Sequence, residues 1–269
     1  MSTSTKSNLW LLAHDDEPAQ FEFCGGHAFA FSRTSPNKTS VNEDAAAVVE
    51  LSPEHGVFVV ADGMGGASSG DRAAKCIVET LIHHLESSDF AGDSARSQIL
   101  DAIEEANREV LGWGIGAGST VVVAEYLDRS IRTFHVGDAT ALVCSNRGTL
   151  KLSTIAHAPV AMAVEAGMID EFEAIIHEDR HLINNCVGST EMKIELGPVF
   201  EMASRDTLIL GSDGLFDNLT TEEIIDVIRV GHFGRQANLL IQLARDRMQT
   251  PETLPSKPDD MTIIGFRQT

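Results

Sequence analysis

Five aspartates stand beside apolar segments of this sequence and could do chemistry as a group. Each lies at one edge of a run of residues typical of a β-strand: Asp44, Asp62, Asp138, Asp213 and Asp259. Strands of one sheet or one sandwich can bring such edges together although they are far apart in sequence. Clustered carboxylates repel one another, so a compact group stays ionised only when cations neutralise it. Because oxygen ligands favour Mg²⁺ or Mn²⁺ over Zn²⁺, the pattern indicates a site for these hard ions.

Two such ions close together can activate a water molecule and stabilise an in-line displacement at phosphorus. The acids therefore predict a binuclear metal hydrolase, and on their own they predict nothing narrower. A simpler interpretation stays open for Asp62, because Asp-Gly after a strand is usually a turn. It also stays open for Glu43 and Asp44, which could form a solvated bend before a strand. The histidines at 157, 177 and 181 are too scattered to nominate as metal ligands.

Composition narrows the class of protein. The chain has 269 residues and a formal net charge of -20, from 40 acids against 20 bases. That balance argues against nucleic acid or an anionic membrane as a partner, because both reward basic patches. The four cysteines are far apart and are typical of reduced thiols. No apolar run is long enough for a membrane span, and the N-terminus lacks the pattern of a secretory signal, so we expect a cytoplasmic protein.

The elements that must position these acids can be predicted from hydrophobic periodicity. The length fits one large domain, which we place at residues 21–269, after a loose N-terminal segment at 1–20. Helical spacing predicts helices over 71–85, 94–111 and 236–248, and Thr220 with Glu223 forms a capping box that starts another. Short apolar runs predict strands, among them 45–51, 57–60, 207–210 and 261–266.

Several motifs around these acids carry a family resemblance. They are NED at 42–44, VVADGMGG, GSTVVVA, HVGDAT, LGSDGLFD and PDDMTII, and they occur in this order from about Phe21 to Phe266. The chain resembles the metal-dependent serine/threonine phosphatases of the protein phosphatase 2C (PPM) family, in its bacterial branch. The resemblance implies an α+β fold, an αββα sandwich of two antiparallel sheets flanked by helices. It also implies a monomer that dephosphorylates phosphoserine and phosphothreonine in proteins, opposing a protein kinase.

The resemblance also implies a role for each matched residue. Asp62 matches the acid that bridges two Mn²⁺ or Mg²⁺ ions, and Gly63 matches a residue that ligates through its carbonyl. Asp213 and Asp259 match the other ligands of the first ion. Glu43 and Asp44 match acids that hold waters of the metal shell, and Asp138 matches, with Asp213, a third and weaker metal site.

Some positions depart from the family pattern. The family usually has an Arg three residues before the Asn of the NED motif, where it grips the substrate phosphate, but here that position is Thr39. Arg33 is the nearest arginine and our candidate for phosphate binding, with Lys38 beside Thr39. Many relatives carry a proposed proton donor, His, where Met64 stands, so that role falls to another group or to water.

Two alternatives remain at this stage. The missing Arg leaves open a catalytically weak or inactive phosphatase-like module that binds or regulates. The run Gly66–Gly70 also fits the G-x-S-x-G pattern of serine hydrolases, but Ser68 lies well past the strand end, where a nucleophile elbow would not place it.

Overall fold

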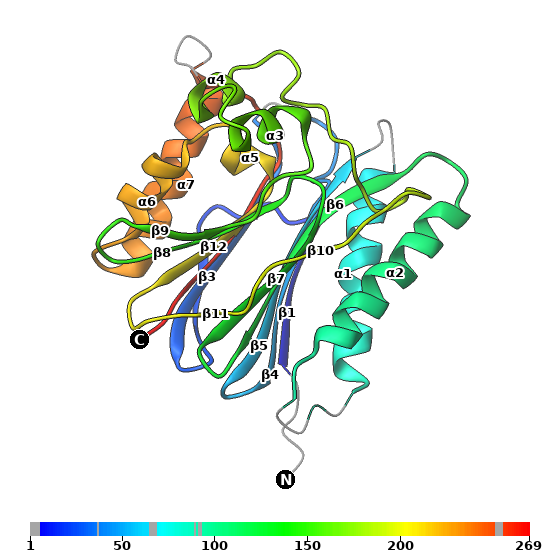
Figure 1. Ribbon diagram of the computed structural model, residues 1–269, viewed down its shortest axis with the longest axis horizontal. Helices are drawn as coiled ribbons and strands as arrows, with labels where there is room; N and C mark the ends of the chain where they lie inside the picture. Colours follow the sequence, from blue (N-terminus) through cyan, green and yellow to red (C-terminus); the bar gives the residue numbers. More distant parts are fainter. Residues whose placement is uncertain (1–5, 37, 65–68, 89, 91–92, 251–254) are drawn as a thin grey trace.

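Two antiparallel β-sheets pack face to face in the computed structural model, which describes residues 6–36, 38–64, 69–88, 90, 93–250 and 255–269 (Figure 1). The first sheet runs in the order β1 (Lys6–Leu11), β4 (Asp44–Ser52), β5 (His55–Met64), β6 (Gly118–Leu127), β7 (Ser130–Val136) and β10 (Glu195–Leu196), with β11 (Phe200–Glu201) also on β7. The second runs β2 (Ala19–Phe23), β3 (Gly26–Arg33), β13 (Met261–Arg267), β12 (Thr207–Gly211), β8 (Thr140–Cys144) and β9 (Leu150–Ser153).

Helices cover the outer faces of both sheets (Figure 1). On the first sheet lie α1 (Gly70–Glu86) and α2 (Arg96–Gly112). On the second lie α6 (Thr221–Ile228) and α7 (Phe233–Gln249). Three short helices are α3 (Pro159–Glu165), α4 (Glu171–Ile175) and α5 (Asp213–Phe216). This arrangement confirms the predicted αββα sandwich.

Strand β5 illustrates why the central strands are continuously apolar. Val57 and Val59 pack under α1 and α2, whereas Phe58 and Val60 face the second sheet. Because successive side chains point to opposite faces and both faces are covered, each position must be apolar. Phe58 lies between the rings of Phe23 and Phe266, and burial of such a ring stabilises the fold by about 2–3 kcal/mol.

The predicted helices are present with shifted ends. α1 and α2 match the expected spans within two residues, and the capping box before α6 is formed by Thr220 and Glu223. α7 begins at Phe233, three residues earlier than predicted, because that ring packs against Phe29 at 5.2 Å between centroids. α3 and α4 lie in a segment for which we predicted no element.

The N-terminal segment, expected to be loose, contains a paired strand over residues 6–11. Strand β1 pairs with β4 from Lys6 opposite Glu50 to Leu11 opposite Ala45. The Trp10 ring stacks on Phe21 at 6.3 Å between centroids, and this supplies apolar contact to the second sheet. The pairing satisfies the backbone groups along the edge of β4. The division of the chain at residue 20 stays a prediction.

All four cysteines are free thiols, and Cys24, Cys76 and Cys144 are buried. Burial raises the pKa of Cys24 to about 12 and those of Cys76 and Cys144 to about 11, so these thiols stay protonated. Among the described residues, no helix is both long and apolar enough to cross a lipid bilayer.

Candidate metal centre

Asp44 and Asp62 lie side by side at the end of the first sheet. They are directly opposite each other in the register of β4 and β5. Both follow the parity of residues that face the second sheet, such as Val48 and Val60. The two carboxylates therefore stand on the inner face, just beyond the apolar contact between the sheets.

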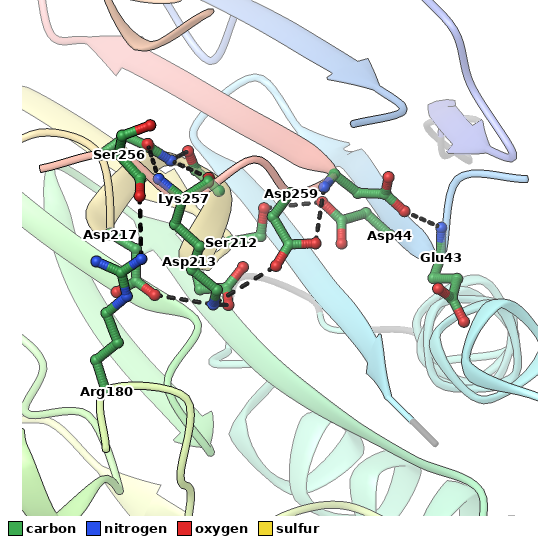
Figure 2. Close-up of polar contacts among 12 residues, drawn as sticks. Glu43, Asp44, Arg180, Ser212, Asp213, Asp217, Ser256, Lys257 and Asp259 are labelled. Carbon is green, nitrogen blue, oxygen red and sulfur yellow. Dashed lines mark hydrogen bonds and ion pairs between the residues drawn. The ribbon is translucent and has the colours of Figure 1, made fainter. Parts of the chain in front are cut away.

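Asp213 and Asp259 come from the second sheet. Asp213 opens α5, two residues after the end of β12, and Asp259 comes two residues before β13, which pairs with β12. Asp138 follows β7 and precedes β8. Figure 2 shows Asp44, Asp213 and Asp259 in one region of the structure.

The electrostatics of Asp62 show that all five predicted acids converge. Burial raises the pKa of Asp62 well above its usual value, and the carboxylates that raise it further are Asp213, Asp44, Asp138 and Asp259. No described residue donates a hydrogen bond to the Asp62 side chain. Like charges without such donors need a cation to stay ionised together.

A hydrogen-bond relay joins the two sheets at Asp44. The Ser212 hydroxyl donates to the Asp44 carboxylate at 2.8 Å and accepts the Thr262 N–H at 3.0 Å. Burial raises the pKa of Asp44 well above its usual value despite the Ser212 bond, and the charges of Asp260 and Asp213 add to the shift. This relay fixes Asp44 relative to the start of α5.

Asp138 is held by a turn that one histidine clamps at two points. Gly137 has a φ of +93°, a conformation that favours glycine. The backbone N–H of Gly137 donates to the ring Nδ1 of His157 at 3.0 Å, and the backbone N–H of His157 donates to the Gly137 carbonyl at 2.9 Å. Burial, then Asp213 and Asp217, raises the pKa of Asp138 to about 7.

His135, His157 and Glu195 form a second group whose ligand atoms lie within 4.8 Å of one another. The hydrogen bond that His157 Nδ1 accepts from Gly137 places the ring proton on Nε2, which donates to Glu195 at 3.1 Å. A metal on Nε2 would have to remove that proton. We therefore assign His157 a hydrogen-bonding role.

Gly63 lies where a side chain would not fit. A Cβ at this position would be 2.1 Å from the Gly70 carbonyl oxygen and 2.6 Å from that of Glu43. The Gly63 N–H donates to the same Glu43 carbonyl at 3.2 Å. The absence of a side chain therefore brings the end of β5 against both Glu43 and the start of α1.

Four residues of the centre received no role in the sequence analysis: Ser212, Asp217, Lys257 and Asp260. Asp217 lies one helical turn after Asp213, a spacing that could have marked it. Asp260 is buried, and its carboxylate accepts N–H groups from Ser35 and Glu43, each at 2.7 Å. It thus ties the loop that carries Glu43 to the start of β13. Burial raises the pKa values of Asp217 and Asp259 to about 6, with Asp213 the next cause in each case.

The basic groups near the centre are already engaged. Arg33 Nη1 donates to the Asp15 carbonyl at 2.7 Å and to the Asp16 carboxylate at 2.6 Å. Lys38 Nζ donates to Glu43 at 2.6 Å and to Asp260 at 2.7 Å. Arg33, Lys38 and Asp259 line one cavity of about 170 Å³, so the candidate for phosphate binding lies beside the centre.

A larger cavity opens on the other side of the centre. Its volume is about 910 Å³, and Asp138, Asp213 and Asp217 line it together with Arg180. Residues of α3 and α4, such as Val160 and Ile175, supply its apolar wall. The acids are thus reachable from a space large enough for a peptide side chain.

The donor set fits hard divalent ions. The side chains that converge on Asp62 offer only carboxylate oxygens, and burial, followed by the charge of Asp213, raises the pKa of Asp62, Asp138 and Asp259. Ser68, on which the serine hydrolase alternative rests, lies outside the described residues.

Comparison with known proteins gives consistent matches. A model of the family described as protein phosphatase 2C matches residues 35–249. The chain is 27% identical over 197 residues to the serine/threonine phosphatase stp of Listeria welshimeri, a match that covers 70% of this chain and 77% of that protein.

Solved structures show the same architecture. The serine/threonine phosphatase Stp1 of Staphylococcus aureus superposes with a TM-score of 0.79 at 25% identity, over 96% of this chain and 98% of that one. The catalytic domain of the serine/threonine protein phosphatase PstP, in complex with two manganese ions, superposes with a TM-score of 0.71 at 22% identity, over 89% of this chain and 96% of that one.

Proposed function

Because the chain belongs to the protein phosphatase 2C family of metal-dependent serine/threonine phosphatases, we propose that its carboxylate centre binds two Mn²⁺ or Mg²⁺ ions for the hydrolysis of phosphoserine and phosphothreonine in proteins. The observation that carries this proposal is the convergence of acids from both sheets on Asp62. When bound, such ions activate a water molecule and stabilise the charge that develops on the transferred phosphoryl group.

Each acid has a proposed task. Asp62, the Gly63 carbonyl, Asp213 and Asp259 would hold the two ions. Glu43 and Asp44 orient water through their carboxylates, and Asp138 with Asp213 offers a third site. The Ser212 relay supports the task of Asp44, because it holds that carboxylate in one orientation.

Substrate binding falls to basic groups at the rim. We assign the substrate phosphate to Arg33, which would exchange its exposed partner Asp16 for the phosphate oxygens. Met64 cannot donate a proton, so the leaving seryl or threonyl oxygen takes its proton from water or from a neighbouring acid.

The substrate, the cellular location, the oligomeric state and the domain bounds are also proposals. The substrate is a phosphorylated protein whose kinase this enzyme opposes, and we propose that the enzyme works in the cytoplasm as a monomer. We place the phosphatase domain at residues 21–269, with 1–20 appended to it. The net charge of -20 agrees with a partner that is neither nucleic acid nor an anionic membrane.

The test is phosphate release from a phosphothreonine peptide, with and without Mn²⁺. We expect turnover that depends on Mn²⁺, that EDTA abolishes, and that inhibitors of serine hydrolases leave intact. Intact Mn²⁺ binding without turnover on phosphoserine or phosphothreonine peptides would instead indicate a regulatory or binding module. Turnover without any metal requirement would contradict the proposed centre.

A further inference from the structure

Lys257 places a positive charge among three carboxylates of the metal centre. Its Nζ donates to Asp213 and to Asp217, the latter at 2.9 Å, and lies 3.5 Å from the Asp259 carboxylate. The side chain is 18% exposed. Figure 2 shows it directed between Asp213, Asp217 and Asp259.

The backbone around Lys257 is fixed so that the side chain reaches these acids. The Lys257 N–H donates to Asn218 Oδ1, and Asn218 Nδ2 donates to the Lys257 carbonyl, both at 2.8 Å. Asn218 is fully buried and also donates to the Gly214 carbonyl, within α5. Arg180 donates to the carbonyl of the preceding residue, Ser256, at 3.1 Å. The lysine is therefore part of a hydrogen-bonded structure that includes the helix carrying Asp213.

The Lys257 side chain keeps its positive charge. Burial would lower the pKa of Lys257, but Asp213, Asp217 and Asp259 together raise it well above its usual value. Lys257 thus stays protonated and compensates part of the negative charge of the centre.

Asp213 and Asp259, two of the three carboxylates that Lys257 contacts, are metal ligands in the proposed function. This inference rests on that function. An ammonium group and a divalent ion that need the same carboxylate oxygens compete for them. Asp217 is outside the proposed ligand set and lies one helical turn from Asp213, so it can keep the ammonium when Asp213 and Asp259 turn to an ion.

We propose that Lys257 is a tethered cation that competes with the metal for Asp213 and Asp259 and so sets the metal concentration at which the enzyme becomes loaded. In the metal-free protein it stabilises the acidic centre. With an ion bound, Asp217 would keep the ammonium that it already holds at 2.9 Å. The lysine thereby lowers metal affinity, and it reduces the repulsion among the carboxylates when no metal is bound.

The test measures Mn²⁺ binding by isothermal titration calorimetry with the full chain and its variants. Lys257→Met removes the competing charge, and we expect its Mn²⁺ affinity to rise by about tenfold or more. Lys257→Arg keeps the charge and should stay within about threefold of the unaltered protein. Lys75→Met makes the same change in net charge on the exposed surface of α1, and it should also stay within about threefold.

Thermal unfolding gives an independent readout without activity. In EDTA, Lys257→Met should unfold at a lower temperature than the unaltered protein. Saturating Mn²⁺ should raise the Tm of Lys257→Met by more than it raises the Tm of the unaltered protein. Lys257→Gln, which keeps a donor but no charge, provides the same comparison if the Met variant does not fold.

The outcomes separate this inference from the proposed function. If the unaltered protein and Lys257→Met bind Mn²⁺ equally and unfold alike in EDTA, the lysine is no competitor and the metal centre stands. If neither protein binds Mn²⁺, the proposed centre is wrong and the inference falls with it.

Discussion

Asp44 and Asp62 are direct cross-strand neighbours on the inner face of the first sheet. Like charges directly opposite each other destabilise an antiparallel pair. The fold therefore keeps an electrostatic cost at the end of an otherwise apolar core. This cost is what a bound cation would relieve, and it makes the metal-free protein sensitive to charge and to pH.

The stability of the metal-free protein should fall as pH rises from 5 to 7.5. Folding raises the pKa of Asp138 to about 7 and those of Asp217 and Asp259 to about 6. A raised carboxyl pKa gives stability that is full below the unfolded pKa and is lost as pH rises through the folded pKa. We expect the Tm in EDTA to drop by about 5 °C or more over this range.

Saturating Mn²⁺ provides the control for this pH dependence. His135, whose pKa is lowered by burial, acts in the opposite direction in both forms, so the difference between the two Tm curves isolates the acids. Parallel curves with and without Mn²⁺ would contradict the role of these carboxylates in metal binding.

Asp62→Asn and Asp213→Asn should each abolish turnover while the fold is retained. Each variant removes a carboxylate that we assign to the metal, yet each also removes like-charge repulsion. Asp62→Asn should therefore unfold in EDTA at a temperature no lower than that of the unaltered protein. Circular dichroism and phosphate release check the two expectations.

Asp101→Asn is the matched control, because Asp101 is exposed on α2. It should keep full activity. Normal turnover in Asp62→Asn or Asp213→Asn would contradict the assigned roles.

Gly63→Ala should lose most activity even though it adds only a methyl group. The added Cβ would lie 2.1 Å from the Gly70 carbonyl oxygen, so the end of β5 must shift away from α1 and Glu43. Gly112→Ala, whose Cβ meets nothing within 4 Å, serves as the control and should leave kcat and Mn²⁺ affinity unchanged. Equal activity of the two variants would show that the backbone at Gly63 does not set the site.

Arg33→Ala should raise the KM for a phosphothreonine peptide by about tenfold or more, because a charge-assisted hydrogen bond to phosphate is lost. The value of kcat should change less. Asp16→Ala removes the exposed partner of Arg33 and should leave KM unchanged or lower it. An unchanged KM in Arg33→Ala would move phosphate binding to another basic group, with Lys38 and Arg180 the neighbouring candidates.

The sequence by itself determined where several strands lie and which acids stand at their edges, whereas the two-layer sandwich was implied by the family resemblance. The alternating burial of β5 follows from a run of Val and Phe that fits a strand covered on both faces. The strand-edge positions of Asp44, Asp62, Asp138, Asp213 and Asp259 were visible because each adjoins such a run. These are local features, so nearby residues along the chain suffice to predict them.

Only the tertiary structure showed that Lys257 lies among those acids. Lys257 lies 40 residues from Asp217 and 44 from Asp213, and its loop gave no periodic signal. Its position depends on Asn218, which is buried at the end of α5, and on Arg180 from the segment after α4. Long-range hydrogen bonds of this kind leave no repeat in the sequence, because the pairing of β12 with β13 within the second sheet brings the segments of Asn218 and Lys257 together.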